Sequence, residues 1–161
     1  MKEQKQMPLT ILLADDDTDD LYFFEKALME LSIPTKLLTV GDGEQLMNYL
    51  LENSEQLPNA LFLDLNMPRK NGSECLAEIK SNEKLKDLPI VMYSTSLNES
   101  IADVLYEKGA HFYMQKSNFS ELIKCVEAVL IFLEKGKLKQ PSREHFIICA
   151  PKVKSQINVR T

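Results

Sequence analysis

The sequence predicts a doubly wound α/β fold, in which a parallel sheet is covered by helices on both faces. Short apolar runs that read as buried strands alternate five times with longer segments whose apolar residues recur at helical spacing. Glycine, proline and polar residues separate these segments, as in five successive βα units. Parallel strands need crossover helices, and 161 residues suit one domain with a full core.

The five expected strands share apolar, strand-forming runs that stop at a polar or turn-forming residue. They are residues 9–14, 35–40, 60–64, 89–94 and 111–115. The expected helices share an apolar stripe, and they cover residues 18–31, 44–51, 73–80, 98–108 and 118–134.

Local signals set the ends of these helices. Asp19 and Asp20 lie in the first turn of the first helix, where the helix dipole favours acids, so we interpret them as helix-start acids rather than ligands. Asp17 reads as a loop or capping residue. Ser73 is a candidate cap of the third helix, whereas Asn98 caps the fourth helix and Gly109 ends it.

Composition and charge exclude several classes of protein. No apolar run approaches the ~20 residues that span a bilayer, and the N-terminus has no apolar segment of a signal peptide, so we expect a cytoplasmic protein without a membrane partner. Cys75, Cys125 and Cys149 form no C-x-x-C pair and are expected to stay reduced. The net charge is −5, and the acidic body argues against nucleic-acid binding.

Polar side chains gather where the expected strands end. The first strand ends at Asp15-Asp16-Asp17, the third at Asp64, the fourth at Ser94 and the fifth at Lys116. In an open parallel sheet, ligands bind outside the carboxyl ends of the strands. Several carboxylates together make a hard oxygen site that suits Mg²⁺, and a metal with an ammonium forms a clamp for a phosphoryl group. A carboxylate can itself be the nucleophile and form an aspartyl-phosphate.

Four pieces of sequence carry a resemblance to a known family. They are ILLADDD, LFLDLNMPRKNG, PIVMYSTS and HFYMQK, and Gly72 stands eight positions after Asp64. Over roughly residues 8–135, the chain resembles the receiver domain of two-component response regulators, of the chemotaxis-regulator type. The resemblance implies a flavodoxin-like sheet of five parallel strands in the order 2-1-3-4-5.

The resemblance also implies a role for each acidic position. Asp64 would be the phosphoacceptor, and Asp15 and Asp16 would be the acidic pair, with Asp16 as a direct Mg²⁺ ligand. Asp64 would also bind the metal, and Asn66 would offer it a backbone carbonyl. The family takes phosphate from a sensor histidine kinase or a histidine phosphotransfer protein, so either is an expected partner.

The remaining implied roles concern the switch. Ser94 matches the hydroxyl that moves toward the phosphoryl group, Lys116 the lysine that pairs with it, and Tyr113 the aromatic residue whose ring changes position. Two residues depart from the usual pattern. Ser117 follows Lys116 in place of proline, which leaves the bond between them trans or strained, and Thr95 is larger than the usual alanine or glycine and narrows access to the phosphoryl group.

Three other functions are weighed against this one. A haloacid-dehalogenase-like phosphatase needs threonine where the sequence has Asp19, and a calcium loop fails because Pro68 occupies a ligand position. A receiver-fold module that binds proteins without phosphorylation remains the alternative. We expect that the chain is not an enzyme, except that it catalyses its own Mg²⁺-dependent phosphorylation and dephosphorylation.

The predicted domain covers residues 8–135, and a basic C-terminal tail covers 136–161. These 26 residues are too few for an ordinary helix-turn-helix domain, so we expect a stand-alone regulator that binds a downstream protein or relays phosphate. The tail contains an apolar segment, 145–151. Either the tail is disordered, or Phe146, Ile147 and Ile148 dock on the domain or on a second protomer of a homodimer.

Overall fold

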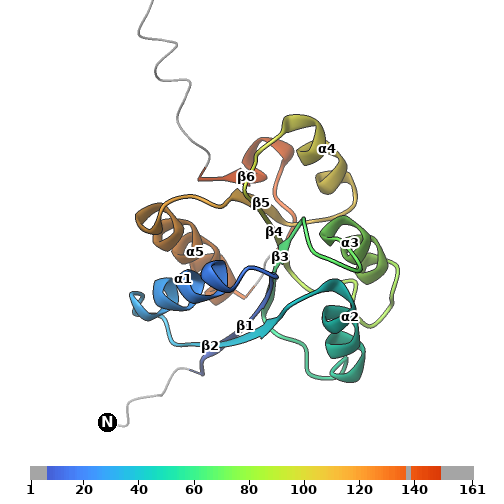
Figure 1. Cartoon of the computed structure of the whole chain (residues 1–161), viewed down its shortest axis with the longest axis horizontal. Coiled ribbons are helices and arrows are strands. Elements are labelled where there is room, and N and C mark those ends of the chain that lie inside the picture. The colour runs from blue at the N-terminus through green and yellow to red at the C-terminus, as the bar shows by residue number, and fades with distance from the viewer. Residues whose placement is uncertain (1–6, 137–138, 150–161) are drawn as a thin grey trace, which may run out of the picture.

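The computed structural model describes residues 7–136 and 139–149, which form one twisted parallel sheet with helices on both faces (Figure 1). Within these residues the sheet has six strands in the order β2-β1-β3-β4-β5-β6. The strands are β1 (Leu9–Ala14), β2 (Thr35–Val40), β3 (Ala60–Asp64), β4 (Ile90–Ser94), β5 (Phe112–Gln115) and β6 (Ile147–Ile148). The helices are α1 (Thr18–Met29), α2 (Gly43–Glu52), α3 (Gly72–Lys80), α4 (Glu99–Glu107), α5 (Phe119–Glu134) and the short 3₁₀ helix η1 (Arg143–His145).

The two faces of the sheet carry two apolar cores. Side chains of β1 alternate between them, since Leu12 packs with α2, α3 and α4 on one face and Leu13 packs with α1 and α5 on the other. β3 and β4 are buried along their whole length, as expected of central strands covered on both faces. The doubly wound fold predicted from the sequence is confirmed.

Helix caps explain why the elements begin where they do. Asp17 accepts hydrogen bonds from the N–H groups of Asp19 and Asp20, which confirms its capping role. Asn98 caps α4, as predicted. The expected cap at Ser73 is wrong, because Asn71 caps α3 and forms a reciprocal capping box with Glu74.

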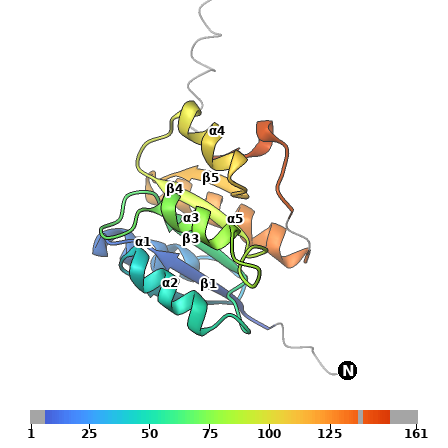
Figure 2. The same ribbon diagram turned by 90° about the vertical axis from the view of Figure 1, so that its right-hand side faces the viewer.

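The sixth strand is the difference from the five-stranded sheet that was expected. Residues 139–149, which we call the C-terminal strap, run beside α4 and add β6 in parallel to the edge of β5 (Figure 2). Phe146 is fully buried and packs edge-on against Tyr106, with ring centroids 5.2 Å apart. Arg143 forms ion pairs with Glu99 and Asp103 of α4. The strap therefore covers an edge that would otherwise expose unpaired backbone groups.

The expectation that all three cysteines stay reduced is wrong in this structure. Cys125 of α5 forms a disulfide with Cys149 at the end of the strap, with Cα atoms 5.8 Å apart. Proximity in the fold, which sequence spacing cannot show, brings the two sulfurs together. Cys75 is free, as predicted, and it is buried.

Two further expectations can be compared with the structure, and one cannot. Among the described residues, no helix is both long and apolar enough to cross a membrane. The bond between Lys116 and Ser117 is trans, so serine at this position brings no strain of that kind. The basic residues of the tail beyond Cys149, together with Ala150 and Pro151 of the apolar segment, lie outside the described residues.

Candidate functional site

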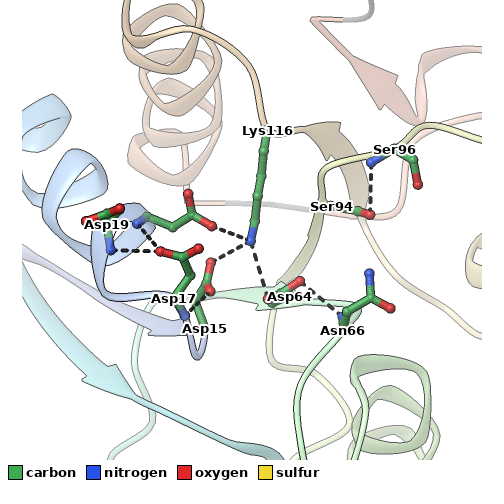
Figure 3. Close-up of polar contacts among 9 residues, drawn as sticks. Asp15, Asp17, Asp19, Asp64, Asn66, Ser94, Ser96 and Lys116 are labelled. Carbon is green, nitrogen blue, oxygen red and sulfur yellow. Dashed lines mark hydrogen bonds and ion pairs between the residues drawn. The ribbon is translucent and has the colours of Figure 1, made fainter.

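The predicted site residues come together at the carboxyl edge of the sheet. Asp15 follows β1, Asp64 ends β3, Ser94 ends β4, and Lys116 follows β5 (Figure 3). Parallel strands end on the same side of the sheet, so residues up to about 100 positions apart in the sequence meet there. The Lys116 side chain points from the end of β5 into the group of aspartates.

The acidic cluster has the composition of a site for a divalent cation. One carboxylate oxygen from each of Asp15, Asp16 and Asp64 lies within 4.8 Å of the others. Asp15 and Asp64 are buried and Asp16 is exposed, so the cluster opens to solvent on one side. One oxygen of Asp15 accepts the Asp17 N–H at 2.9 Å. Its other oxygen, Oδ2, is buried and lies 2.8 Å from the Lys116 ammonium.

The excess of negative charge decides whether the residues fit Mg²⁺. Asp15, Asp16 and Asp64 lie together, and the Lys116 ammonium is shared between Asp15, Asp64 and Asp20, so one cation faces several carboxylates. Carboxylates this close repel one another, and a bound divalent cation offsets that repulsion. Three carboxylates are the hard ligands that Mg²⁺ takes, and the open side leaves room for retained waters. The residues present therefore fit the ion that the sequence predicts. The backbone carbonyl of Asn66 as a further ligand stays a prediction.

A glycine fixes the loop that presents Asp64 and Asn66. A Cβ on Gly72 would lie 2.2 Å from the Asp64 carbonyl oxygen, so no other residue fits without displacing the backbone. The Gly72 N–H donates to the Leu65 carbonyl at 3.0 Å, which closes the loop between β3 and α3. The Asn66 N–H in turn donates to Oδ1 of Asp64 at 3.1 Å and orients that carboxyl group.

Lys116 is the cation at the centre of the site. Its Nζ lies 2.8 Å from Asp15, 2.8 Å from Asp20 and 3.3 Å from Asp64, and its side chain is only 10% exposed. Burial alone would lower the pKa of Lys116, but these carboxylates raise it above its ordinary value, so the side chain stays charged. The ring of Tyr93 lies beneath the ammonium, 5.1 Å from its centroid.

Asp64 is a buried carboxylate whose charged form is poorly stabilised by its surroundings. Burial raises its pKa to about 6, and the neighbouring Asp15 adds to the rise. The hydrogen bond from Asn66 and the charge of Lys116 oppose the change. Above pH 6 the group is therefore ionised, but it is poorly solvated and can gain stabilisation from any further positive charge or covalent change.

The predicted switch residues lie next to one another beside the site. Ser94 is buried, and its hydroxyl oxygen accepts a long hydrogen bond from the Ser96 N–H at 3.4 Å. The Tyr113 ring is turned inward and fully buried, and its hydroxyl donates to the Ser96 carbonyl at 3.0 Å. Thr95 is exposed next to Ser94 at the mouth of the site.

Two residues that contact Lys116, Asp20 and Tyr93, were not predicted from the sequence to belong to the site. Asp20 was interpreted as a helix-start acid, which is true but incomplete, since it also binds Lys116. Its place in the first turn of α1 gave no signal of this contact, because Lys116 is 96 positions away in the sequence. Tyr93 had no signal beyond its place next to Ser94.

The comparisons with known proteins agree with this geometry. The profile described as "Response regulator receiver domain" matches residues 11–127. The chain belongs to the response regulator receiver domain family. The response regulator Rcp1 of Synechocystis sp. (strain ATCC 27184 / PCC 6803 / Kazusa) is 36% identical over 137 residues, which cover 82% of this chain and 93% of Rcp1.

Solved structures of receiver proteins have the same fold. The phosphorylated cyanobacterial phytochrome response regulator RcpA is 35% identical, with a TM-score of 0.73, and the match covers 81% of this chain and 97% of that one. The Mn²⁺-bound form of Rcp1 is 37% identical, with a TM-score of 0.71, and the match covers 81% and 99%. The chain is thus a response regulator of two-component signalling, and its acidic cluster stands where receiver domains bind a divalent metal.

Proposed function

We propose that this receiver accepts a phosphoryl group on Asp64 in the presence of Mg²⁺ and then changes the surface around β5 and α4 to regulate a protein partner or relay phosphate. The donor is the phosphohistidine of a sensor histidine kinase or a histidine phosphotransfer protein. The observation that carries the proposal is the Asp64 carboxyl group, which lies within 3.3 Å of the Lys116 ammonium and shares the acidic cluster with Asp15 and Asp16.

The chemistry follows from these contacts. An oxygen of Asp64 forms a bond to phosphorus while the bond from phosphorus to the donor histidine nitrogen breaks, and that nitrogen leaves with the electron pair. Asp15, Asp16 and Asp64 would hold Mg²⁺, which would supply Lewis-acid stabilisation of the charge on the phosphoryl oxygens. Lys116 donates to a phosphoryl oxygen from the other side. In dephosphorylation, a water oxygen attacks phosphorus, the bond from phosphorus to the Asp64 oxygen breaks, and inorganic phosphate and the Asp64 carboxylate are released. In this proposal the chain acts only on its own phosphorylation and dephosphorylation.

The proposed conformational switch depends on Ser94 and Tyr113, which lie beside the phosphoryl group on Asp64. The Ser94 hydroxyl can rotate away from the Ser96 N–H and donate to a phosphoryl oxygen, which adds a contact that the unphosphorylated state lacks. That contact biases the chain toward a second conformation. Tyr113 is hydrogen-bonded to the same short segment, at Ser96, so its inward position belongs to the equilibrium that the phosphoryl group shifts.

The relatives support the proposal through their own descriptions. One is a phosphorylated regulator and another a divalent-metal complex. RcpA is described as a phytochrome response regulator, so a histidine kinase of the phytochrome type is the first kinase to assay as donor. Such kinase chemistry would place the reaction in the cytoplasm.

The test is phosphorylation by acetyl phosphate, followed by intact mass, with and without Mg²⁺. We expect a gain of one phosphoryl group that depends on Mg²⁺ and is lost in Asp64→Asn. Asp19→Asn is the matched control, because it removes an aspartate of the same segment that lies outside the cluster. A chain that takes no label under conditions that label another receiver would instead support a module that binds its partner without phosphorylation.

A further inference from the structure

The ammonium of Lys116 has a third acidic neighbour besides the two expected ones. Asp20 is one of three carboxylates around the ammonium, and Nζ donates to its Oδ2 at 2.8 Å. Asp15 lies at the same distance, and its Oδ2 is buried. Asp64 is more distant, at 3.3 Å.

Asp20 reaches the site because α1 begins beside it. Asp17 caps the helix and fixes its first turn, and Asp20 lies in that turn on the face toward the strand ends. Its side chain is 29% exposed, so it is less costly to leave charged than Asp15 or Asp64. Asp20 stands outside the cluster of three carboxylates that could hold a cation.

Asp20 therefore differs from Asp15 and Asp64 in the groups that it would bind during the reaction. Asp15 and Asp64 are the residues that a divalent cation and a phosphoryl group would engage, and each then has less charge to offer Lys116. Asp20 has no such competing partner, so it can hold Lys116 throughout the reaction. An ammonium has three N–H donors, so one can stay on Asp20 while another turns to the phosphoryl group.

We propose that Asp20 is a positioning residue, which anchors Lys116 beside Asp64 so that one ammonium donor meets the incoming phosphoryl group. The inference rests on the proposed function and adds a residue to it. The Tyr93 ring supports the ammonium on another side, 5.1 Å away, so Lys116 is confined between a carboxylate and an aromatic face. Without Asp20, the ammonium would bind Asp15 more closely and compete with the divalent cation for that carboxylate.

The test compares labelling by acetyl phosphate in the full chain at saturating Mg²⁺. We expect Asp20→Ala to lower the initial rate of labelling about tenfold, which corresponds to ~1.4 kcal/mol. Asp20→Asn keeps an acceptor oxygen without the charge and should lie between wild type and Asp20→Ala. Asp19→Ala is the matched control, because it removes the same charge from the same helical turn and should change the rate less than about twofold.

A double-mutant cycle separates positioning from a general effect on the helix. In a Lys116→Ala background, Asp20→Ala should cause no further loss, because the residue through which it acts is gone. The same loss in both backgrounds, or an equal loss in Asp19→Ala, would overturn the proposal. If Lys116→Ala labels too slowly to measure, the four proteins are compared by urea unfolding, where additive effects of Asp20 and Lys116 would overturn it.

The outcomes also separate this inference from the proposed function. A wild-type chain that takes no label refutes both. A wild-type chain that labels at the same rate as Asp20→Ala refutes the role of Asp20 alone and leaves Asp64 as the phosphoacceptor.

Discussion

Removing the charge of Asp64 is expected to stabilise the chain when no divalent metal is present. The residue is 4% exposed, and burial raises its pKa to about 6 from the ordinary 3.8. Ionising such a group in the folded state costs up to about 3 kcal/mol at neutral pH. Asparagine has the same shape, and its carbonyl oxygen can still accept the Asn66 N–H. We therefore expect Asp64→Asn to raise the free energy of unfolding at pH 7.5 by roughly 1–3 kcal/mol.

The pH dependence has a definite sign. A carboxyl whose folded pKa is raised favours folding most below its unfolded pKa, and this contribution is lost as the pH rises through the folded pKa. The difference between wild type and Asp64→Asn should therefore vanish near pH 4 and be complete above about pH 7. Urea unfolding with a chelator at both pH values measures it. Asp16→Asn, at an exposed position of the same cluster, should give a much smaller gain.

Mg²⁺ should reverse the order of stability. A ligand at about 100 times its Kd stabilises the folded state by about 2.7 kcal/mol, and only the chain with Asp64 offers the complete carboxylate set. A variant less stable than wild type at pH 7.5 without metal would refute the reasoning. A gain in the free energy of unfolding that persists unchanged at pH 4 would also refute it. Neither result fits a buried carboxylate whose ionisation destabilises the folded state.

Four other predictions concern positions away from Asp64. His111 accepts the Ile90 N–H at its Nδ1, and burial lowers its pKa to about 4. Stability should therefore fall by up to ~1.4 kcal/mol per pH unit as the pH drops from 6.5 to about 4, and His111→Gln should lose this dependence in urea unfolding. Phe146→Ala should cost about 3–5 kcal/mol in the same assay, whereas the exposed Glu144→Ala should cost less than about 0.5; equal costs would mean that the strap does not pack. Thr95→Ala should speed phosphoryl transfer or hydrolysis in a labelling time course, and equal rates would contradict a role for Thr95 in access. Cys149→Ser, or dithiothreitol, should lower the free energy of unfolding by about 3 kcal/mol, because the bridge closes a loop across 24 positions; identical melting with and without the reductant would contradict the pairing.

The central fold could be predicted because its signals are local. Each of the five expected strands coincides with an observed one to within one residue, since buried runs such as ALFLD stop at a charged residue, here Asp64. Helix ends were less certain, because several polar residues near a start compete for the cap. Asn71 was overlooked in favour of Ser73 for that reason. The carboxyl-end rule then placed Asp15, Asp64 and Lys116 together without any coordinates.

What the sequence did not reveal depends on contacts between distant residues. Asp20 has a complete local explanation in the first turn of α1, and its bond to a lysine 96 positions away leaves no trace in the sequence. The two-residue strand β6 is too short to show a period, and it forms because β5 offers a free edge. The disulfide likewise depends on the strap returning to α5.

The strap has a consequence for how this receiver can signal. The Tyr113 N–H donates to the Phe146 carbonyl at 3.0 Å, and the Tyr113 ring lies 6.2 Å from the Phe146 ring, so the inward tyrosine is enclosed by the chain's own C-terminal segment. Arg143 joins the same segment to α4 through two ion pairs. In the proposed mechanism, the phosphoryl group shifts the equilibrium of Ser94 and Tyr113. Because interiors are close-packed, a change in the position of the Tyr113 ring would disturb the packing of Phe146. In the proposed mechanism, a phosphoryl group that shifts this tyrosine would therefore also affect the strap, so the strap would belong to the surface that the switch alters.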